Sequence, residues 1–116
     1  MEKEMLADTL METFKERLNA LADINKGWNK KIQFYLDDIN IGYVIQFRED
    51  GTVDHVDKKS LEKGKVLPAD VTVHLTVDVM DRIMKKEIHP VMAMTQGLLQ
   101  VEGELSALSR LLPVIT

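Results

Sequence analysis

The chain has 116 residues, no cysteine and a formal net charge of −4 at pH 7, with 45% hydrophobic and 29% charged residues. This size and composition are typical of one globular domain, so we expect residues 1–116 to form a single domain. The lack of cysteine excludes disulfides, thiolate metal sites and thiol catalysis. Acids and bases alternate along the chain without a basic stretch, which argues against nucleic acid as a partner.

Nothing in the sequence indicates a membrane span or a secretion signal. No apolar run approaches the ~18 residues that cross a bilayer. The N-terminus carries Glu2, Glu4 and Asp8, the wrong charge for a signal peptide. We therefore expect a cytoplasmic protein.

The first half of the chain predicts a helix and then three strands. Apolar residues recur every three or four positions from Met5 to Leu21, as in an amphipathic helix, which should end near Ala22. Asp50 and Gly51 are typical of a tight hairpin turn. Alternating apolar and polar residues predict three strands that form an antiparallel meander, over residues 32–36, 41–47 and 52–56.

The second half predicts a loop over residues 58–67, a strand over 71–77 and a helix capped by Asp78. Lys85 and Lys86 should lie near the end of that helix. Pro90 should then force a break and begin the next helix, which Gly97 should end. The last expected elements are a strand over residues 98–102 and a helix over residues 104–112. Four helices and five strands in this order predict an α+β fold with a mostly antiparallel sheet covered on one face by helices.

The last third of the chain contains the strongest hint of function. Nearly every position from 91 to 112 is apolar or small, apart from the residues that end helices or form turns. Four of the seven methionines, which are side chains that adapt to varied apolar shapes, lie on the two helices that flank Pro90: Met80, Met84, Met92 and Met94. The pattern fits an ordinary core or one wall of an apolar compartment.

We find no arrangement of side chains that predicts catalysis, a metal site or a cofactor. His55, His74 and His89 have neither metal-ligand spacing nor a neighbouring nucleophile, so we interpret them as structural. Asp54 and Asp57 flank His55 on an expected strand, an arrangement common on exposed strands.

Two other charged groups lie in turns or loops. Asp37 and Asp38 belong to an expected turn and are weak candidates for acid–base work. The only local basic excess could contact anionic lipid headgroups, although a solvated loop is the simpler interpretation; it comprises Lys58, Lys59, Lys63 and Lys65.

The order of the landmarks resembles the sterol carrier protein 2 (SCP-2) sterol-transfer domain family over roughly residues 14–112. The landmarks are Trp28 before the strand 32–36, the turn Asp50-Gly51, the strand 71–77 with its following helix, Ala93 before Gln96-Gly97, the segment 98–104 and a leucine-rich last helix. The family signature reads like Gly-Lys-x-x-Pro…Ala-x-x-x-Gly-x-hydrophobic-x-hydrophobic-x-Gly-Asp.

The chain departs from that pattern at three places. Lys86-Glu87 stands where the family usually has Gly-Lys, and Glu104 where it often has Asp or Asn. The last residues, Val114-Ile115-Thr116, are not a peroxisomal address of the Ser-Lys-Leu type.

The resemblance implies a five-stranded sheet backed by helices, with a lipid-sized apolar tunnel between the layers. It also implies non-catalytic binding or transfer of a fatty acid, acyl-CoA, phospholipid or sterol-like lipid. An empty void of ~300 Å³ would cost ~7 kcal/mol at about 24 cal/mol per Å³. We therefore expect the unliganded protein to collapse the cavity, aided by flexible methionines, or to stay filled.

The residues that we expect to line the cavity are apolar and come from the strands and the last three helices. They are Phe34, Tyr43, Ile45, Val73, Leu75, Met80, Ile83, Met84, Val91, Met92, Met94, Leu98, Leu105 and Leu108. Which face of each strand points inward stays open at this stage.

A second hypothesis is that the domain is a protein-interaction or dimerisation module, accessory to a lipid- or quinone-related enzyme. Besides a lipid or another long apolar molecule, a homodimer and transient contact with a membrane therefore stay open as partners.

Overall fold

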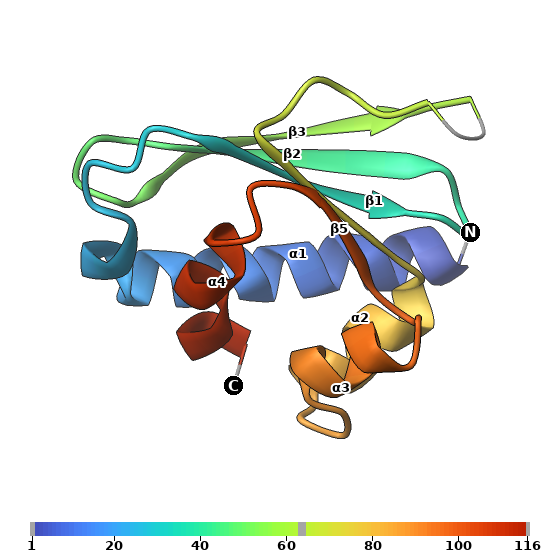
Figure 1. Ribbon diagram of the computed structural model, residues 1–116. Helices are drawn as coiled ribbons and strands as arrows, with labels where there is room; N and C mark the ends of the chain where they lie inside the picture. Colours follow the sequence, from blue (N-terminus) through green and yellow to red (C-terminus); the bar gives the residue numbers. More distant parts are fainter. Residues whose placement is uncertain (1, 63–64, 116) are drawn as a thin grey trace.

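The computed structural model describes residues 2–62 and 65–115, with side chains described for all of these except residues 108 and 115. A five-stranded sheet has helices packed on one face, with α1 running along its length (Figure 1). The strands, in spatial order, are β3 (Val53–Ser60), β2 (Ile41–Phe47), β1 (Lys31–Leu36), β4 (Val71–Leu75) and β5 (Gln100–Gly103). The helices are α1 (Glu2–Ala20), α2 (Val77–Met84), α3 (Pro90–Thr95) and α4 (Ala107–Ile115), with a short 3-10 helix over Ala22–Asn25.

The sheet is mixed but mostly antiparallel, which confirms the predicted α+β class. Only β1 and β4 pair in parallel, and the other three neighbouring pairs are antiparallel. Because β3 and β4 are separated by β2 and β1, the chain between them must cross the sheet. It crosses on the face away from the helices, where the side-chain amide of Gln33 is buried. This amide donates to the carbonyl of Leu67 at 2.8 Å and accepts from the N–H of Leu67 at 2.9 Å.

The core lies between the sheet and the helices, and the structure decides which strand faces point inward. Ile32, Phe34 and Leu36 of β1 are buried against α1, which contributes Phe14 and Leu18. The rings of Phe14 and Phe34 pack edge to face with centroids 5.1 Å apart. The register aligns the inward residues of β2 and β4 with those of β1, so Tyr43, Ile45, Val73 and Leu75 share this inner face.

The prediction for β3 was wrong in extent, because the strand continues to Ser60 through the first residues of the expected loop. Ser60 pairs with Ile41, so the strand follows β2 along its whole length. Charged residues are compatible with this position because β3 is an edge strand, and lysines on an edge discourage pairing with other chains.

The boundary between β4 and α2 also differs from the prediction. The strand ends at Leu75, and the helix is capped by Thr76, whose hydroxyl accepts from the N–H of Val79 at 3.2 Å, rather than by Asp78. Val77 is buried, so the helix must begin there to place this side chain in the core.

α2 ends at Met84, next to the two lysines expected near its end, but Pro90 is not what ends it. Two hydrogen bonds close it, from the N–H of Lys86 to the carbonyl of Ile83 and from the N–H of Glu87 to the carbonyl of Arg82. This is a Schellman motif with Lys86 in the left-handed region at φ 64°.

The predicted start and end of α3 are confirmed. Pro90 occupies the first turn, and Gly97 follows the helix at φ 74° with the same pair of closing hydrogen bonds. The last two elements begin later than expected, since β5 starts at Gln100 and α4 at Ala107. α4 continues past the expected end at Leu112 because the buried Val114 packs into the core.

Candidate functional site

A small cavity lies between the sheet and helices α1 and α2, within the hydrophobic core. Its walls come from α1, two strands, α2 and the segment before β5: Phe14, Phe34, Leu75, Met80, Ile83, Met84 and Leu99. All seven side chains are apolar, so the cavity offers no polar partner for a water or a charged group. The lining therefore favours apolar groups over polar ones.

The cavity has a volume of about 20 Å³, the space of roughly one water molecule. Sites that hold lipid-sized ligands span ~300–1,000 Å³, so the tunnel expected between the layers is closed in this state. The side chains of Met80 and Met84 lie against the cavity and are unbranched, with three rotatable bonds each. Their flexibility gives the fold a way to fill the space without ligand and to vacate it for one.

Five of the fourteen residues expected to line a cavity are brought together here: Phe34, Leu75, Met80, Ile83 and Met84. Sequence reasoning missed Phe14 and Leu99. Phe14 belongs to the apolar stripe of α1, which was predicted only as one face of an amphipathic helix. Leu99 was placed inside a strand, although it precedes β5 and is buried.

Of the other nine residues, the eight whose side chains are described do not line this cavity. Tyr43, Ile45 and Val73 are buried elsewhere in the core, and Met94 is half-buried against it. The side chain of Leu108 lies outside the described residues. Four expected wall residues are exposed: Val91 (48%), Met92 (51%), Leu98 (36%) and Leu105 (60%).

The exposure of Val91 and Met92 has a simple geometric reason. α3 has six residues and buries only Pro90 and Ala93, with Met94 half-buried against the core, so Val91 and Met92 lie on its solvent-exposed side. The helix is apolar on several sides, and the sequence pattern therefore did not indicate which side packs inward.

A polar cluster stands where α1 meets β2 and β3. The Tyr43 hydroxyl donates to the Asp8 carboxylate at 2.6 Å, and the Lys58 ammonium bonds to Asp8 and to Glu4 at 2.8 Å. Burial, together with the hydrogen bond to Asp8, raises the pKa of Tyr43 above its ordinary value. Burial works to raise the pKa of Asp8, but the bonds from Tyr43 and Lys58 outweigh it and lower that pKa.

This cluster lines an open groove of about 460 Å³. Its charges are already paired with one another, and Asp8, Tyr43 and Lys58 hold α1 against the sheet. We interpret the groove as structural. Lys58 lies in β3 and not in a loop, which is where the sequence had suggested the four lysines between residues 58 and 65 would lie. Of the other loop lysines, Lys65 pairs with Glu62, and Lys63 lies outside the described residues.

The histidines have structural surroundings. His89 caps α3, its Nδ1 accepting from the N–H of Val91 at 3.1 Å. His55 is exposed between Asp54 and Asp57, and His74 lies 3.5 Å from Asp37 and 3.4 Å from Glu102.

Among the residues that the structure describes, no group of three or more His, Cys, Asp or Glu could hold a metal ion. The second residue of the expected acidic turn, Asp38, accepts from the N–H of Val77 and pairs with Lys3. It thus anchors the start of α2. In the described part of the chain, no helix has the length and apolar character needed to cross a membrane.

Comparison with known proteins places this architecture in a known group. The model of the SCP-2 sterol transfer family matches residues 8–115. No curated protein sequence is similar enough to count as a match.

Solved structures with the same fold include palmitated SCP2L2 from Aedes aegypti, with a TM-score of 0.68, 21% identity and coverage of 93% of this chain and 92% of that one. The ubiquinone synthesis protein UbiJ-SCP2 matches with a TM-score of 0.64 and 16% identity, covering 99% and 96%. The sec-alkylsulfatase Pisa1 from Pseudomonas sp. matches with a TM-score of 0.61 and 21% identity over 81% of this chain, which spans 14% of that enzyme's length.

Proposed function

We propose that this chain, which belongs to the SCP-2 sterol transfer family, binds one long-chain lipid between its sheet and α2. The protein then releases the lipid without chemical change. The observation that carries the proposal is the apolar cavity lined by Met80 and Met84. Both side chains would move aside to admit an alkyl chain, and both would return when it leaves. A fatty acid is the first ligand to test, with acyl-CoA, phospholipid and sterol-like lipids as the other classes.

The energetics favour carriage over permanent storage. Each buried methylene gains ~0.8 kcal/mol, and a bilayer offers nearly the same amount. Exchange of a lipid between a membrane and the protein is then close to balanced. Such a protein needs an apolar wall and an entrance, and it needs no catalytic group.

The proposal predicts that palmitate raises the melting temperature of delipidated protein and that Met84→Lys abolishes this rise. The added ammonium would lie in the cavity, where burial of an unpaired charge opposes binding. Melting followed by circular dichroism, with and without palmitate, measures the effect.

Met92→Lys is the matched control, because it adds the same charge at an exposed methionine on α3. It should leave the palmitate-induced rise unchanged. If Met84→Lys fails to fold, Met84→Phe places a stiffer ring in the cavity and should also diminish the rise. Lack of any shift with every lipid class, in protein shown to be delipidated, would contradict the proposed function.

A second candidate function is that of an interaction module. The exposed apolar side chains Val91, Met92 and Leu105 are the observation that favours it, since partner-binding surfaces often carry such groups. One protein of similar fold is a ubiquinone synthesis protein, although 16% identity supports the fold alone. Size-exclusion chromatography separates the two candidates: a stable oligomer without bound lipid, disrupted by Met92→Lys, favours the module.

A further inference from the structure

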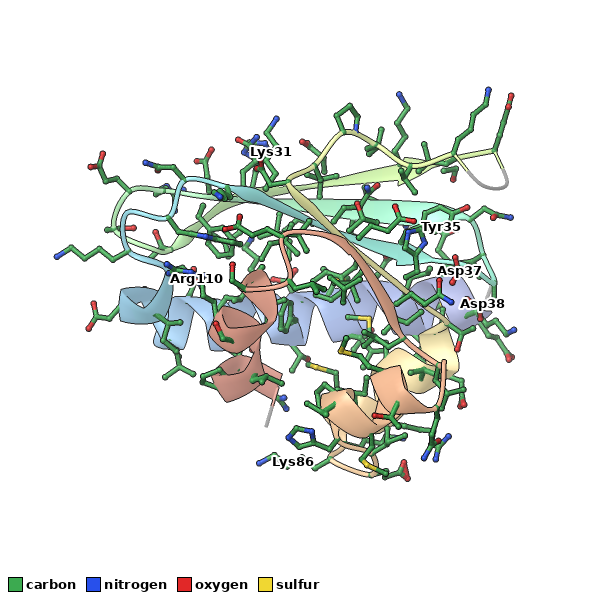
Figure 2. The ribbon with its side chains drawn as sticks, viewed as in Figure 1. Lys31, Tyr35, Asp37, Asp38, Lys86 and Arg110 are labelled. Atoms are coloured by element: carbon green, nitrogen blue, oxygen red, sulfur yellow. The ribbon has the colours of Figure 1, made fainter. Side chains whose placement is uncertain are left out.

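A second pocket lies beside the apolar cavity, where the last turns of α1, the α2–α3 turn and the end of α4 come together. It has a volume of about 340 Å³, and its lining residues are Arg17, Ala20, Leu21, Lys86, Pro113 and Val114. Figure 1 shows the α2–α3 turn and the end of α4 projecting on the same side of α1, and Figure 2 places Lys86 on that turn. The pocket thus combines two cations with four apolar side chains.

Both cations are available for an anion. Within the described part of the chain, neither Arg17 nor Lys86 forms an ion pair with a carboxylate. By contrast, the neighbouring Lys85 pairs with Asp81 at 3.0 Å. Arg17 presents a planar guanidinium that suits carboxylate and phosphate groups.

Met84 and Arg17 bring this pocket close to the apolar cavity. Met84 lines the cavity, and its sulfur lies 3.9 Å from Nη1 of Arg17, which lines the pocket. A rotamer change at Met84 is therefore the movement that we expect to connect the two spaces. An alkyl chain in the cavity would then have its headgroup beside Arg17.

The backbone at Lys86 points to a role for its side chain. Lys86 and Gly97 occupy the same position in two Schellman motifs, at φ 64° and φ 74°. Glycine adopts this conformation without steric cost, whereas a lysine does not. The resemblance to the family also aligns Lys86 with a glycine, so the side chain here is an addition that the turn itself does not require.

We propose that Arg17 and Lys86 bind the anionic headgroup, a carboxylate or a phosphate, of a lipid whose chain enters the cavity past Met84. This inference rests on the proposed function and adds the entrance and the headgroup class. It makes the pocket between α1, α4 and the α2–α3 turn the mouth of the site.

The test compares three lipids with the same alkyl chain, which are palmitate, hexadecyl phosphate and the neutral hexadecanol. Each is delivered from cyclodextrin to delipidated protein, and Kd is measured by calorimetric titration. Two charge-assisted contacts should make wild type bind the palmitate or the phosphate at least about tenfold more tightly than hexadecanol. The lipid that shows the larger preference distinguishes a fatty acid from a phospholipid as the source of the headgroup.

The double variant R17Q/K86Q should lose this preference and keep its affinity for hexadecanol. The matched control is K15Q/K85Q, which removes two charges from adjacent positions outside the pocket and should keep the preference. Arg17→Lys, which retains the charge and the fold, should keep part of it. An undiminished preference in R17Q/K86Q, an equal loss in K15Q/K85Q, or no preference in wild type would each overturn the inference.

Lys86→Gly separates headgroup binding from folding. It should raise the melting temperature, because glycine relieves the left-handed backbone, while it weakens palmitate binding relative to hexadecanol. A variant with higher melting temperature and unchanged preference would contradict a role for the lysine side chain. Binding of hexadecanol without preference for either anion refutes this inference alone. No binding of any of the three lipids, together with no melting shift with the other lipid classes, refutes the proposed function as well.

Discussion

Tyr43 shows how one polar group can stabilise the packing of a helix on a sheet. Its ring lies in the core, and its hydroxyl reaches Asp8 at the edge of α1, where Lys58 completes the cluster. Because the pKa of Tyr43 is raised in the folded protein, the folded state holds this proton more tightly than the unfolded state does. The corresponding stabilisation is complete below the ordinary pKa of 10.0 and is lost as the pH rises above it.

The pKa of Asp8 is shifted in the opposite direction. Its pKa is lowered from 3.8, so its stabilisation is present above that pH and is lost as the pH falls below it. The cluster therefore contributes most between these two limits. The charge state that matters is an ionised Asp8 beside a neutral Tyr43.

We predict that Tyr43→Phe lowers the free energy of unfolding by about 1 kcal/mol at neutral pH, the usual net value of one hydrogen bond. The variant should also lose less stability than wild type when the pH rises above 10, because the perturbed hydroxyl is gone. Urea denaturation at several pH values measures both effects. Parallel stability curves for the two proteins at alkaline pH would contradict this assignment.

At the scale of elements, α4 is attached to the 3-10 helix and to the core by different kinds of contact. Arg110 lies 5.2 Å from the centre of the Trp28 ring and donates to the carbonyl of Ile24 at 2.8 Å (Figure 2). The same helix buries Leu111 and Val114 in the core. An ion pair between Lys30 and Glu104 secures the segment that precedes α4, and it lowers the pKa of Glu104.

We predict that Arg110→Ala destabilises the protein by about 1–2 kcal/mol, from the lost ring contact and hydrogen bond. Arg110→Lys should retain only part of the stability that Arg110→Ala loses, since an ammonium does not stack on the indole and donate to the carbonyl with the same geometry. Thermal unfolding monitored by Trp28 fluorescence reports both variants. Equal stability of Arg110→Lys and wild type would show that charge alone matters here.

Helix α3 buries fewer residues than α1 or α2 does. α3 buries two residues, and the turn before it carries a lysine in a left-handed conformation. The α2 side chains that face the sheet include Met80 and Met84, which can change rotamer without displacing the backbone. Movement that opens the cavity is therefore expected on this side of the molecule and not at α1.

For the whole molecule, stability and ligand binding are linked through the closed cavity. A ligand that binds only the folded state stabilises it by about 2.7 kcal/mol at one hundred times its Kd. The side chains that fill the cavity in the unliganded protein lose their packing when a lipid enters. These side chains and a bound lipid therefore compete for the same space.

Met84→Ala should shift this competition. We predict that it lowers the stability of the unliganded protein by ~2–5 kcal/mol, because it enlarges the cavity, and that palmitate then produces a larger rise in melting temperature than in wild type. Calorimetric melting with and without palmitate tests both parts. A smaller ligand-induced rise in the variant would show that Met84 contacts the lipid rather than occupies its place.

The sequence predicted those features that depend on near neighbours in the chain. The bounds of β2, the Pro90 start of α3 and the Gly97 end followed from alternation, fixed φ and tolerance of positive φ, all of which are local properties. The same local rules did not predict the turn that closes α2, because Lys86 fills a position where glycine would have marked a left-handed residue.

The cavity was predictable only in part, for a physical reason. Alternation and helical spacing placed Phe34, Leu75, Met80, Ile83 and Met84 on apolar faces, which was enough to name them. They could not separate these residues from Val91 and Met92, since an apolar stripe does not reveal whether another layer covers it.

The sequence by itself therefore determined the class of fold, its strands and helices and the apolar chemistry of the site. Only the tertiary structure decided which apolar side chains meet, that their cavity is closed to about 20 Å³, and that Arg17 and Lys86 lie beside it. These are contacts between residues far apart in the chain, and their geometry depends on how the layers pack together.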